Sequence, residues 1–132
     1  MFFGKKYRKL EQVIFRTGSA MTRTYKVYHY DFTTGLMETY QEKYPDVIED
    51  RKSTILIERI NLSYQKAFGA AGILDWETSY VNRMIKDGHQ WSLKMIFKKG
   101  KEKEVFGSNA YPEDWNTLML IVRQTDRALR QN

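Results

Sequence analysis

The chain of 132 residues contains no cysteine, which excludes a disulfide scaffold, a cysteine nucleophile and every thiolate metal site. Only two residues are histidine, so a zinc centre would draw most of its ligands from carboxylates, and we expect no metal site. Apolar runs span only a handful of residues, far short of the roughly 20 that a membrane helix needs. Because the chain also shows no export signal or lipidation motif, we expect no membrane contact and a cytoplasmic location.

Proline and glycine are scarce as well, with two and eight residues, which excludes a collagen-like or low-complexity chain. The composition is 42% hydrophobic, 29% charged and 14% aromatic, as in globular proteins that build a core. Chains of this length build a single hydrophobic core, and no linker or internal repeat interrupts the sequence. We therefore expect a single globular domain over residues 1–132.

The formal net charge of +6 is unevenly distributed along the chain. Residues 1–30 carry a net +6, residues 31–60 a net −3, and residues 91–132 a net +3. A dipolar surface of this kind can steer an anionic partner toward the protein. The simpler interpretation is a solvated surface that aids solubility.

Alternating residues predict three strands in the first third of the chain, at residues 12–17, 23–32 and 36–43. Gly35 suits the short turn between the last two, which form a hairpin. In the second strand, Tyr25, Val27 and His29 share one face and Lys26, Tyr28 and Tyr30 the other. The pattern leaves open which face is exposed to solvent.

The period changes to three and four residues over residues 53–70, which predicts a helix capped by Ser53 and ended by Gly72. The competing interpretation makes residues 54–60 a strand, because this segment is rich in β-branched isoleucine. The helix would then begin only at Asn61. An irregular, partly polar stretch follows as far as Gly88.

The last third predicts a second hairpin and a second helix. Residues 90–97 alternate clearly, with Trp91, Leu93 and Phe97 on one face, and residues 101–107 form the return strand. A helix begins at or near Pro112, and we expect its apolar stripe to pack on that strand face; the stripe contains Trp115, Leu118, Met119, Val122 and Leu129. The predicted fold is therefore α+β, a mostly antiparallel sheet of about five strands with two helices packed on one face.

Residues with catalytic potential are few. Asp87 and His89 could act as a carboxylate and a general base, with Ser92 or Ser108 as the nucleophile of a hydrolase. Such short strings arise readily by chance, and a turn before the strand would leave His89 substantially exposed. No phosphate-binding glycine motif occurs. We therefore expect no catalytic residue and no cofactor, and the hydrolase is the weakest hypothesis.

Aromatic and basic residues alternate on the first hairpin, as they do in proteins that bind single-stranded nucleic acid. The candidate contacts are Arg16, Arg23, Lys26, Tyr28 and Tyr30. One face of any such sheet must also cover the core, so half of these rings would be buried in a purely structural role. The first hairpin therefore carries a second functional hypothesis, nucleic-acid binding.

Three segments of the second half, at residues 73–80, 87–97 and 107–115, resemble a group of small uncharacterised bacterial proteins. The shared pattern is DG-x-QW-x-L followed by GSNAYP-x-x-W. The resemblance implies one domain in the bacterial cytoplasm and adds no catalytic residue.

The GSNAYP segment can be interpreted in two ways. Gly107 would end the strand with positive φ, and Ser108 or Asn109 would accept hydrogen bonds from free amides ahead of the helix, forming a structural corner. Alternatively, free amides at the helix start bind an anion or a partner group, surrounded by Trp91, Ser108, Asn109 and Tyr111. Our leading functional hypothesis is a small non-enzymatic interaction module with a macromolecular partner, a protein rather than a nucleic acid.

Overall fold

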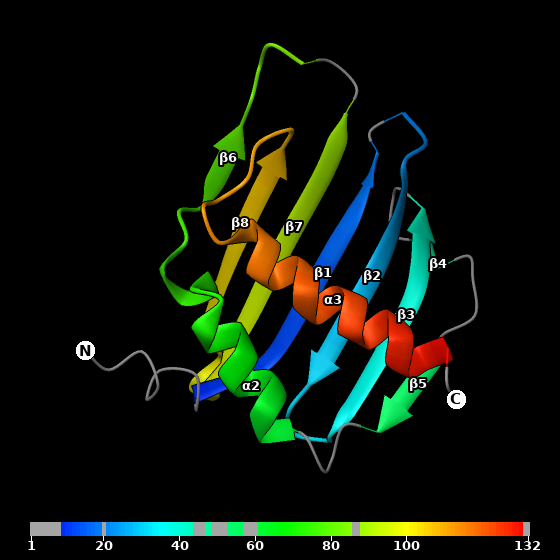
Figure 1. Ribbon diagram of the computed structural model, residues 1–132, viewed down its shortest axis with the longest axis vertical. Helices are drawn as coiled ribbons and strands as arrows, with labels where there is room; N and C mark the ends of the chain where they lie inside the picture. The colour runs from blue at the N-terminus through cyan, green and yellow to red at the C-terminus, as the bar shows by residue number, and fades with distance from the viewer. Residues whose placement is uncertain are drawn as a thin grey trace.

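The computed structural model describes residues 9–19, 21–43, 47–48, 53–56, 61–85 and 88–130, and these build one sheet and two α-helices (Figure 1). The sheet has eight strands within the described residues, in the order β4-β3-β2-β1-β7-β8-β6, with β5 paired to the other end of β3. The eight strands are β1 Leu10–Ser19, β2 Thr24–Asp31, β3 Leu36–Lys43, β4 Val47–Ile48, β5 Ser53–Leu56, β6 Ser79–Val81, β7 His89–Phe97 and β8 Glu102–Ser108.

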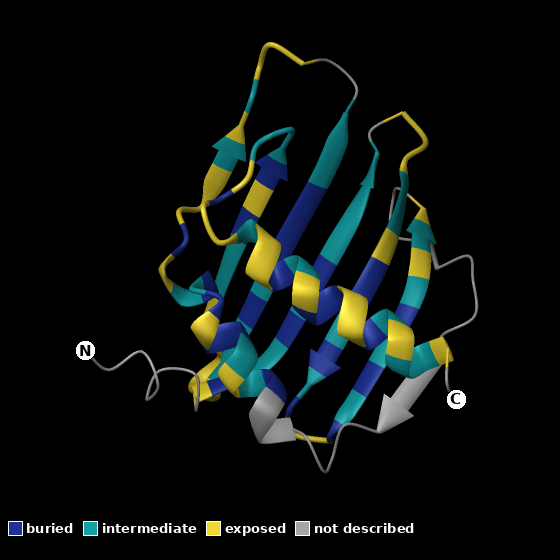
Figure 2. Ribbon diagram, viewed as in Figure 1, coloured by how far each residue is buried: buried dark blue, intermediate teal, exposed yellow. Residues whose placement is uncertain are grey.

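Both helices, α2 (Asn61–Ala70) and α3 (Trp115–Arg130), lie on the same face of the sheet, and α3 crosses the strands diagonally (Figure 1). In α3 the buried residues face the sheet and the exposed ones face solvent (Figure 2). The predicted α+β class and the packing of two helices on one face are confirmed. Neither helix covers the opposite face, which we call the open face.

The core between sheet and helices forms because each strand directs alternate side chains toward α2 and α3. Its largest fully buried members include Tyr30, Phe15, Phe68, Met95 and Leu118. The predicted contact between the face of β7 and the stripe of α3 is confirmed, since the rings of Trp91 and Trp115 lie 4.7 Å apart between centroids. Leu93, Phe97, Leu118 and Val122 belong to the same cluster.

The predicted helix over residues 53–70 is wrong in its first part. Residues Ser53–Leu56 form β5, which pairs antiparallel with β3, and the helix begins at Asn61, as the competing interpretation held. Thr54 and Ile55 are β-branched, and such residues favour strands where a neighbouring strand offers pairing. Residues 57–60 lie outside the described residues.

The sheet is larger than the expected five strands, and it is mixed. The short strands β4 and β6 were not predicted, and β5 was predicted only in the competing interpretation, because segments of two to four residues carry too little periodic signal. β6 pairs parallel with β8, whereas the other pairs are antiparallel. β6 also places the polar stretch after α2 at one edge of the sheet.

Two details around the second helix differ from expectation. Gly107 does not have positive φ; Asn109 does, at 56°, so Asn109 makes the turn after β8. α3 begins at Trp115 instead of Pro112, so Glu113 and Asp114 precede the helix. By contrast, Gly35 and Gly72 have φ of 75° and 76°, as their predicted turn and helix-ending positions require.

Among the described residues, no helix combines the length and the apolar character needed to cross a membrane.

Candidate binding site

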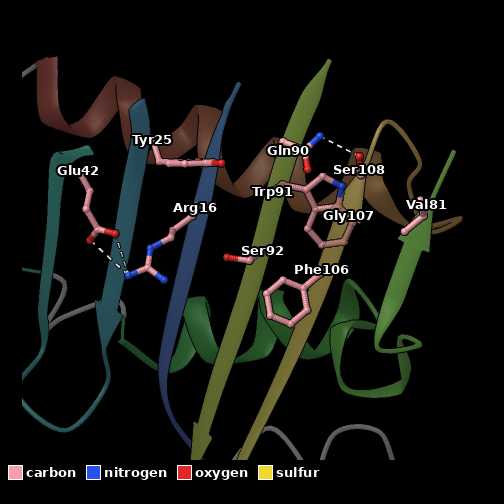
Figure 3. A pocket seen from close by; sticks show the side chains of 10 residues that line it. All are labelled: Arg16, Tyr25, Glu42, Val81, Gln90, Trp91, Ser92, Phe106, Gly107 and Ser108. Carbon is pink, nitrogen blue, oxygen red and sulfur yellow. Dashed lines mark hydrogen bonds and ion pairs between the residues drawn. The ribbon is translucent and has the colours of Figure 1, made fainter. Parts of the chain in front are cut away.

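A hollow of about 380 Å³ lies on the open face, across β1, β2, β7 and β8 (Figure 3). It extends from the end of β3 to the short edge strand β6. We call it the open-face hollow; its lining residues are Arg16, Tyr25, Glu42, Val81, Gln90, Trp91, Ser92, Phe106, Gly107 and Ser108.

One end of the hollow is held by an ion pair between neighbouring strands. Arg16 on β1 extends over β2, and its Nη2 lies 3.1 Å and 3.2 Å from the two carboxylate oxygens of Glu42 on β3. The side chains are 35% and 13% exposed, so the pair is partly desolvated and stronger than a surface pair. The pair makes this end of the hollow close to neutral. Val27, the register partner of Arg16, is fully buried although it lies on the open face.

Arg16 retains hydrogen-bonding capacity beyond Glu42. Its Nε is buried and has no hydrogen-bond partner in the described part of the chain. Its other terminal nitrogen points toward the side of the hollow where Ser92 lies (Figure 3). A guanidinium carries five N–H donors in a rigid plane, and a ligand oxygen placed between Arg16 and Ser92 would satisfy one of them.

The opposite end of the hollow is apolar. Phe106 on β8 and Val81 on β6 are 54% and 52% exposed. The Phe106 side chain lies beside Ser92, its partner in the strand register, and extends over the open face (Figure 3). Above it, the Gln90 amide donates to the Ser108 hydroxyl at 2.8 Å. An exposed phenyl ring beside oriented polar groups is typical of a site that binds a partly apolar ligand.

Gly18 allows Tyr25 to lie across the upper part of β1. A Cβ at Gly18 would come within 2.3 Å of the Thr24 carbonyl oxygen and 2.7 Å of the Tyr25 ring. Any larger residue at this position would therefore push Tyr25 away from the sheet. Gly18 therefore adds no side chain to the open face between Arg16 and Gln90, its register partner on β7.

The four residues predicted around GSNAYP separate into two groups. Ser108 and Trp91 line the open-face hollow, but the Trp91 indole is buried on the helix side and donates to the Ala110 carbonyl oxygen at 3.0 Å. Asn109 accepts a hydrogen bond from the His89 amide at 2.8 Å, and the Tyr111 hydroxyl meets His89 Nδ1 at 2.9 Å. These polar groups are engaged in the corner itself, so the structural interpretation of this segment accounts for them.

The expectation that His89 is substantially exposed is wrong. Its ring is half-buried, it packs against Tyr111 and the edge of Trp115, and its Nε2 bonds the Thr17 hydroxyl. Desolvation by this burial lowers the pKa of His89. Both ring nitrogens are therefore bonded to hydroxyl groups, one of Thr17 on β1 and one of Tyr111 in the corner, and His89 does not line the open-face hollow. Asp87, its predicted carboxylate neighbour, lies outside the described residues.

The predicted nucleic-acid contacts lie on both faces of the sheet. Tyr28 and Tyr30 are buried against the helices, so the prediction that they stack on bases is corrected. The Tyr28 hydroxyl donates to Asp126 of α3, and Lys26 forms an ion pair with the same carboxylate at 3.2 Å. Burial raises the pKa of both tyrosines, most of all that of Tyr30.

The two predicted arginines are separated as well. Arg23 is exposed in the turn after β1, at a φ of 54°, whereas Arg16 lies in the open-face hollow, paired with Glu42. The faces assigned by alternation were correct, but the nucleic-acid set drew on both of them. Burial of one face decides which of these residues can reach a ligand.

Several lining residues were not identified as candidates from the sequence, namely Tyr25, Glu42, Val81, Gln90 and Phe106. The alternation of β2 could have identified Tyr25 as a candidate, because it places this residue on the face opposite Tyr28 and Tyr30. Phe106 and Val81 carried no such signal, because their exposure depends on the parallel pairing of β6 with β8.

No protein-family model matches the chain, and no curated protein matches its sequence.

Proposed function

We propose that this protein is a non-enzymatic binding module whose partner, an extended segment of another polypeptide, occupies the open-face hollow. The observation that carries the proposal is the juxtaposition of exposed Phe106 and Val81 with the Arg16–Glu42 pair in one hollow of the open face. Apolar anchors beside a few oriented polar groups fit side chains and carbonyl groups of a peptide.

The edge strand β6 supports an extended partner. The Phe106 amide donates to the Thr78 carbonyl oxygen and the Asn82 amide to the Ser108 carbonyl oxygen, which marks the residues of this segment that face β8. Successive residues of a strand direct their backbone groups to opposite sides, so Ser79 and Val81 direct theirs away from the sheet. β6 is the last strand of the described sheet on this side, and a partner strand can add there.

Exposed apolar side chains concentrate at the same edge. Besides Val81 and Phe106, the loop after β6 exposes Met84 and Ile85. A partner strand beside β6 would cover part of this surface while its alternate side chains reach the hollow.

Charge on the open face favours a polypeptide over a nucleic acid. Strand register places the acidic residues Asp31, Glu38, Glu42, Glu102 and Glu104 on this face, against the basic residues Arg16 and Lys94. A phosphate backbone needs an excess of lysine and arginine, and this face has the opposite balance.

To test the proposal, ten-residue peptides are selected from a random library for binding to the wild-type protein. Their affinity is then compared with their affinity for the Phe106→Ser variant. Phe106 is exposed, so its replacement leaves the core intact, and we expect the selected peptides to lose at least about tenfold in affinity. Leu120→Ser is the matched control, since Leu120 is exposed on α3, on the other side of the sheet. Failure to select any peptide, or peptides that bind Phe106→Ser as tightly as wild type, would refute the proposal.

A further inference from the structure

A second hollow, of about 460 Å³, lies between the end of α2 and the start of α3. We call it the inter-helix hollow. Its walls include the aromatic residues Trp76 and Tyr80, the turn residue Gly72 and three acidic residues, which are Asp75, Glu113 and Asp114.

The charge in the inter-helix hollow is one-sided. None of its lining residues is basic, although the whole chain carries a net charge of +6. The C-terminal end of α2 also borders it, with no basic residue in the last turn of that helix, and this end is the negative end of the helix dipole. Within the described parts of the chain, the Glu113 and Asp114 carboxylates form no hydrogen bond or ion pair.

Gly72 allows the Asp114 carboxylate to lie against the backbone. A Cβ at Gly72 would come within 2.7 Å of Asp114 Oδ2, and the φ of 76° independently favours glycine at this position. The absence of a side chain at Gly72 therefore leaves room for the carboxylate beside the turn after α2. Among the described residues, no basic side chain forms an ion pair with Asp114.

Trp76 supplies an observation of a different kind. The residue is only 5% exposed, and its indole Nε1 is buried with no hydrogen-bond partner in the described residues. Nε1 lies 3.9 Å from the Cβ position at Gly72 that is 2.7 Å from Asp114 Oδ2, so the indole donor and the carboxylate border the same turn. A buried N–H donor without an acceptor is costly, and a ligand oxygen in the hollow would satisfy it.

The donor and the carboxylates together define the ligand. The exposed carboxylates of Glu113 and Asp114 attract a cation, whereas the buried indole N–H of Trp76 lacks an acceptor in the described residues. A metal ion does not fit, because no group of three acidic or histidine side chains in the described residues is arranged to hold one. An arginine or lysine residue of a polypeptide has both groups, a side-chain cation and a peptide carbonyl oxygen.

We propose that the inter-helix hollow binds an arginine or lysine residue of a partner polypeptide. Its cation pairs with Glu113 and Asp114, and a carbonyl oxygen accepts the hydrogen bond of Trp76 Nε1. The hollow lies on the helix side of the sheet, so this inference is independent of the open-face site and of its test.

Three small probes separate the two parts of the recognition. N-acetyl-arginine amide carries both groups, butylguanidinium carries only the cation, and N-acetyl-alanine amide carries only the carbonyl groups. We measure the indole N–H resonances of the protein by NMR during titration with each probe. We expect a saturable shift of the Trp76 resonance with N-acetyl-arginine amide, weaker binding of butylguanidinium, and no binding of N-acetyl-alanine amide.

The double variant Glu113→Gln/Asp114→Asn removes the charge with little change of shape, and it should weaken binding of N-acetyl-arginine amide by at least about tenfold. Glu77→Gln is the matched control, because Glu77 is exposed close by but does not line the hollow. No saturable shift with the arginine probe, or equal weakening by the double variant and the control, would overturn the proposal. Equal binding of butylguanidinium would overturn the role of Trp76.

Discussion

Replacing Gly107 by alanine tests the packing of the aromatic core through one methyl group. A Cβ at this position would lie 1.8 Å from Trp91 Nε1 and 1.9 Å from its Cε2, well inside van der Waals contact. Gly107 is not among the glycines with positive φ, so alanine meets no backbone strain there. The substitution therefore acts only by displacing the Trp91 indole.

The cost follows from what that indole contacts. Trp91 is buried, and its ring lies 4.7 Å from Trp115, 5.9 Å from Trp76 and 6.1 Å from Tyr80, measured between centroids. It also donates a hydrogen bond to Ala110. Expelling the ring should cost about as much as removing it, about 3–5 kcal/mol. This is a large fraction of the roughly 5–15 kcal/mol that stabilises a typical domain.

Urea unfolding followed by far-ultraviolet circular dichroism measures this loss without depending on tryptophan fluorescence. Gly100→Ala is the control, because nothing lies within 4 Å of its Cβ position and its φ of 76° should cost only about 1–2 kcal/mol. In a Trp91→Ala background, Gly107→Ala should add little, since the clash is gone. A loss below about 1 kcal/mol for Gly107→Ala in the wild-type chain would refute the packing argument.

Three further predictions concern the core, the histidine corner and nucleic acid. Thr125→Val leaves the buried Tyr30 hydroxyl without its 2.7 Å partner and should cost about 1–3 kcal/mol in urea unfolding; a neutral effect would contradict the described hydrogen bond. Because burial lowers the pKa of folded His89 below its unfolded value near 6.5, its contribution to the free energy of unfolding is full above that pH and declines as pH falls below it. His89→Gln should remove this part of the acid destabilisation, and a difference from wild type that is the same at all pH values would contradict it. Titration with single-stranded DNA and RNA at low salt should give no saturable binding, whereas binding that weakens steeply with added salt would restore the nucleic-acid hypothesis.

The clear alternation of β2 and β7, the weaker and more polar pattern of β3 and the apolar stripe of α3 were enough to predict these elements, because each buries one face and the pattern repeats along the element. The turn at Gly35 followed from its freedom to adopt positive φ. The pairing of Trp91 with Trp115 was predictable too, since they lie on the two most apolar surfaces of the chain.

Short strands and candidate sites depended on the tertiary structure. β5 and β6 have four and three residues, and each is a strand because β3 or β8 offers it backbone partners. The sequence separated Tyr25 from Tyr28 by face, but only the docking of α2 and α3 decided that Tyr28 is buried and Tyr25 lines a hollow. Both hollows gather residues distant in sequence, and no local pattern records contacts made by the packing of separate elements.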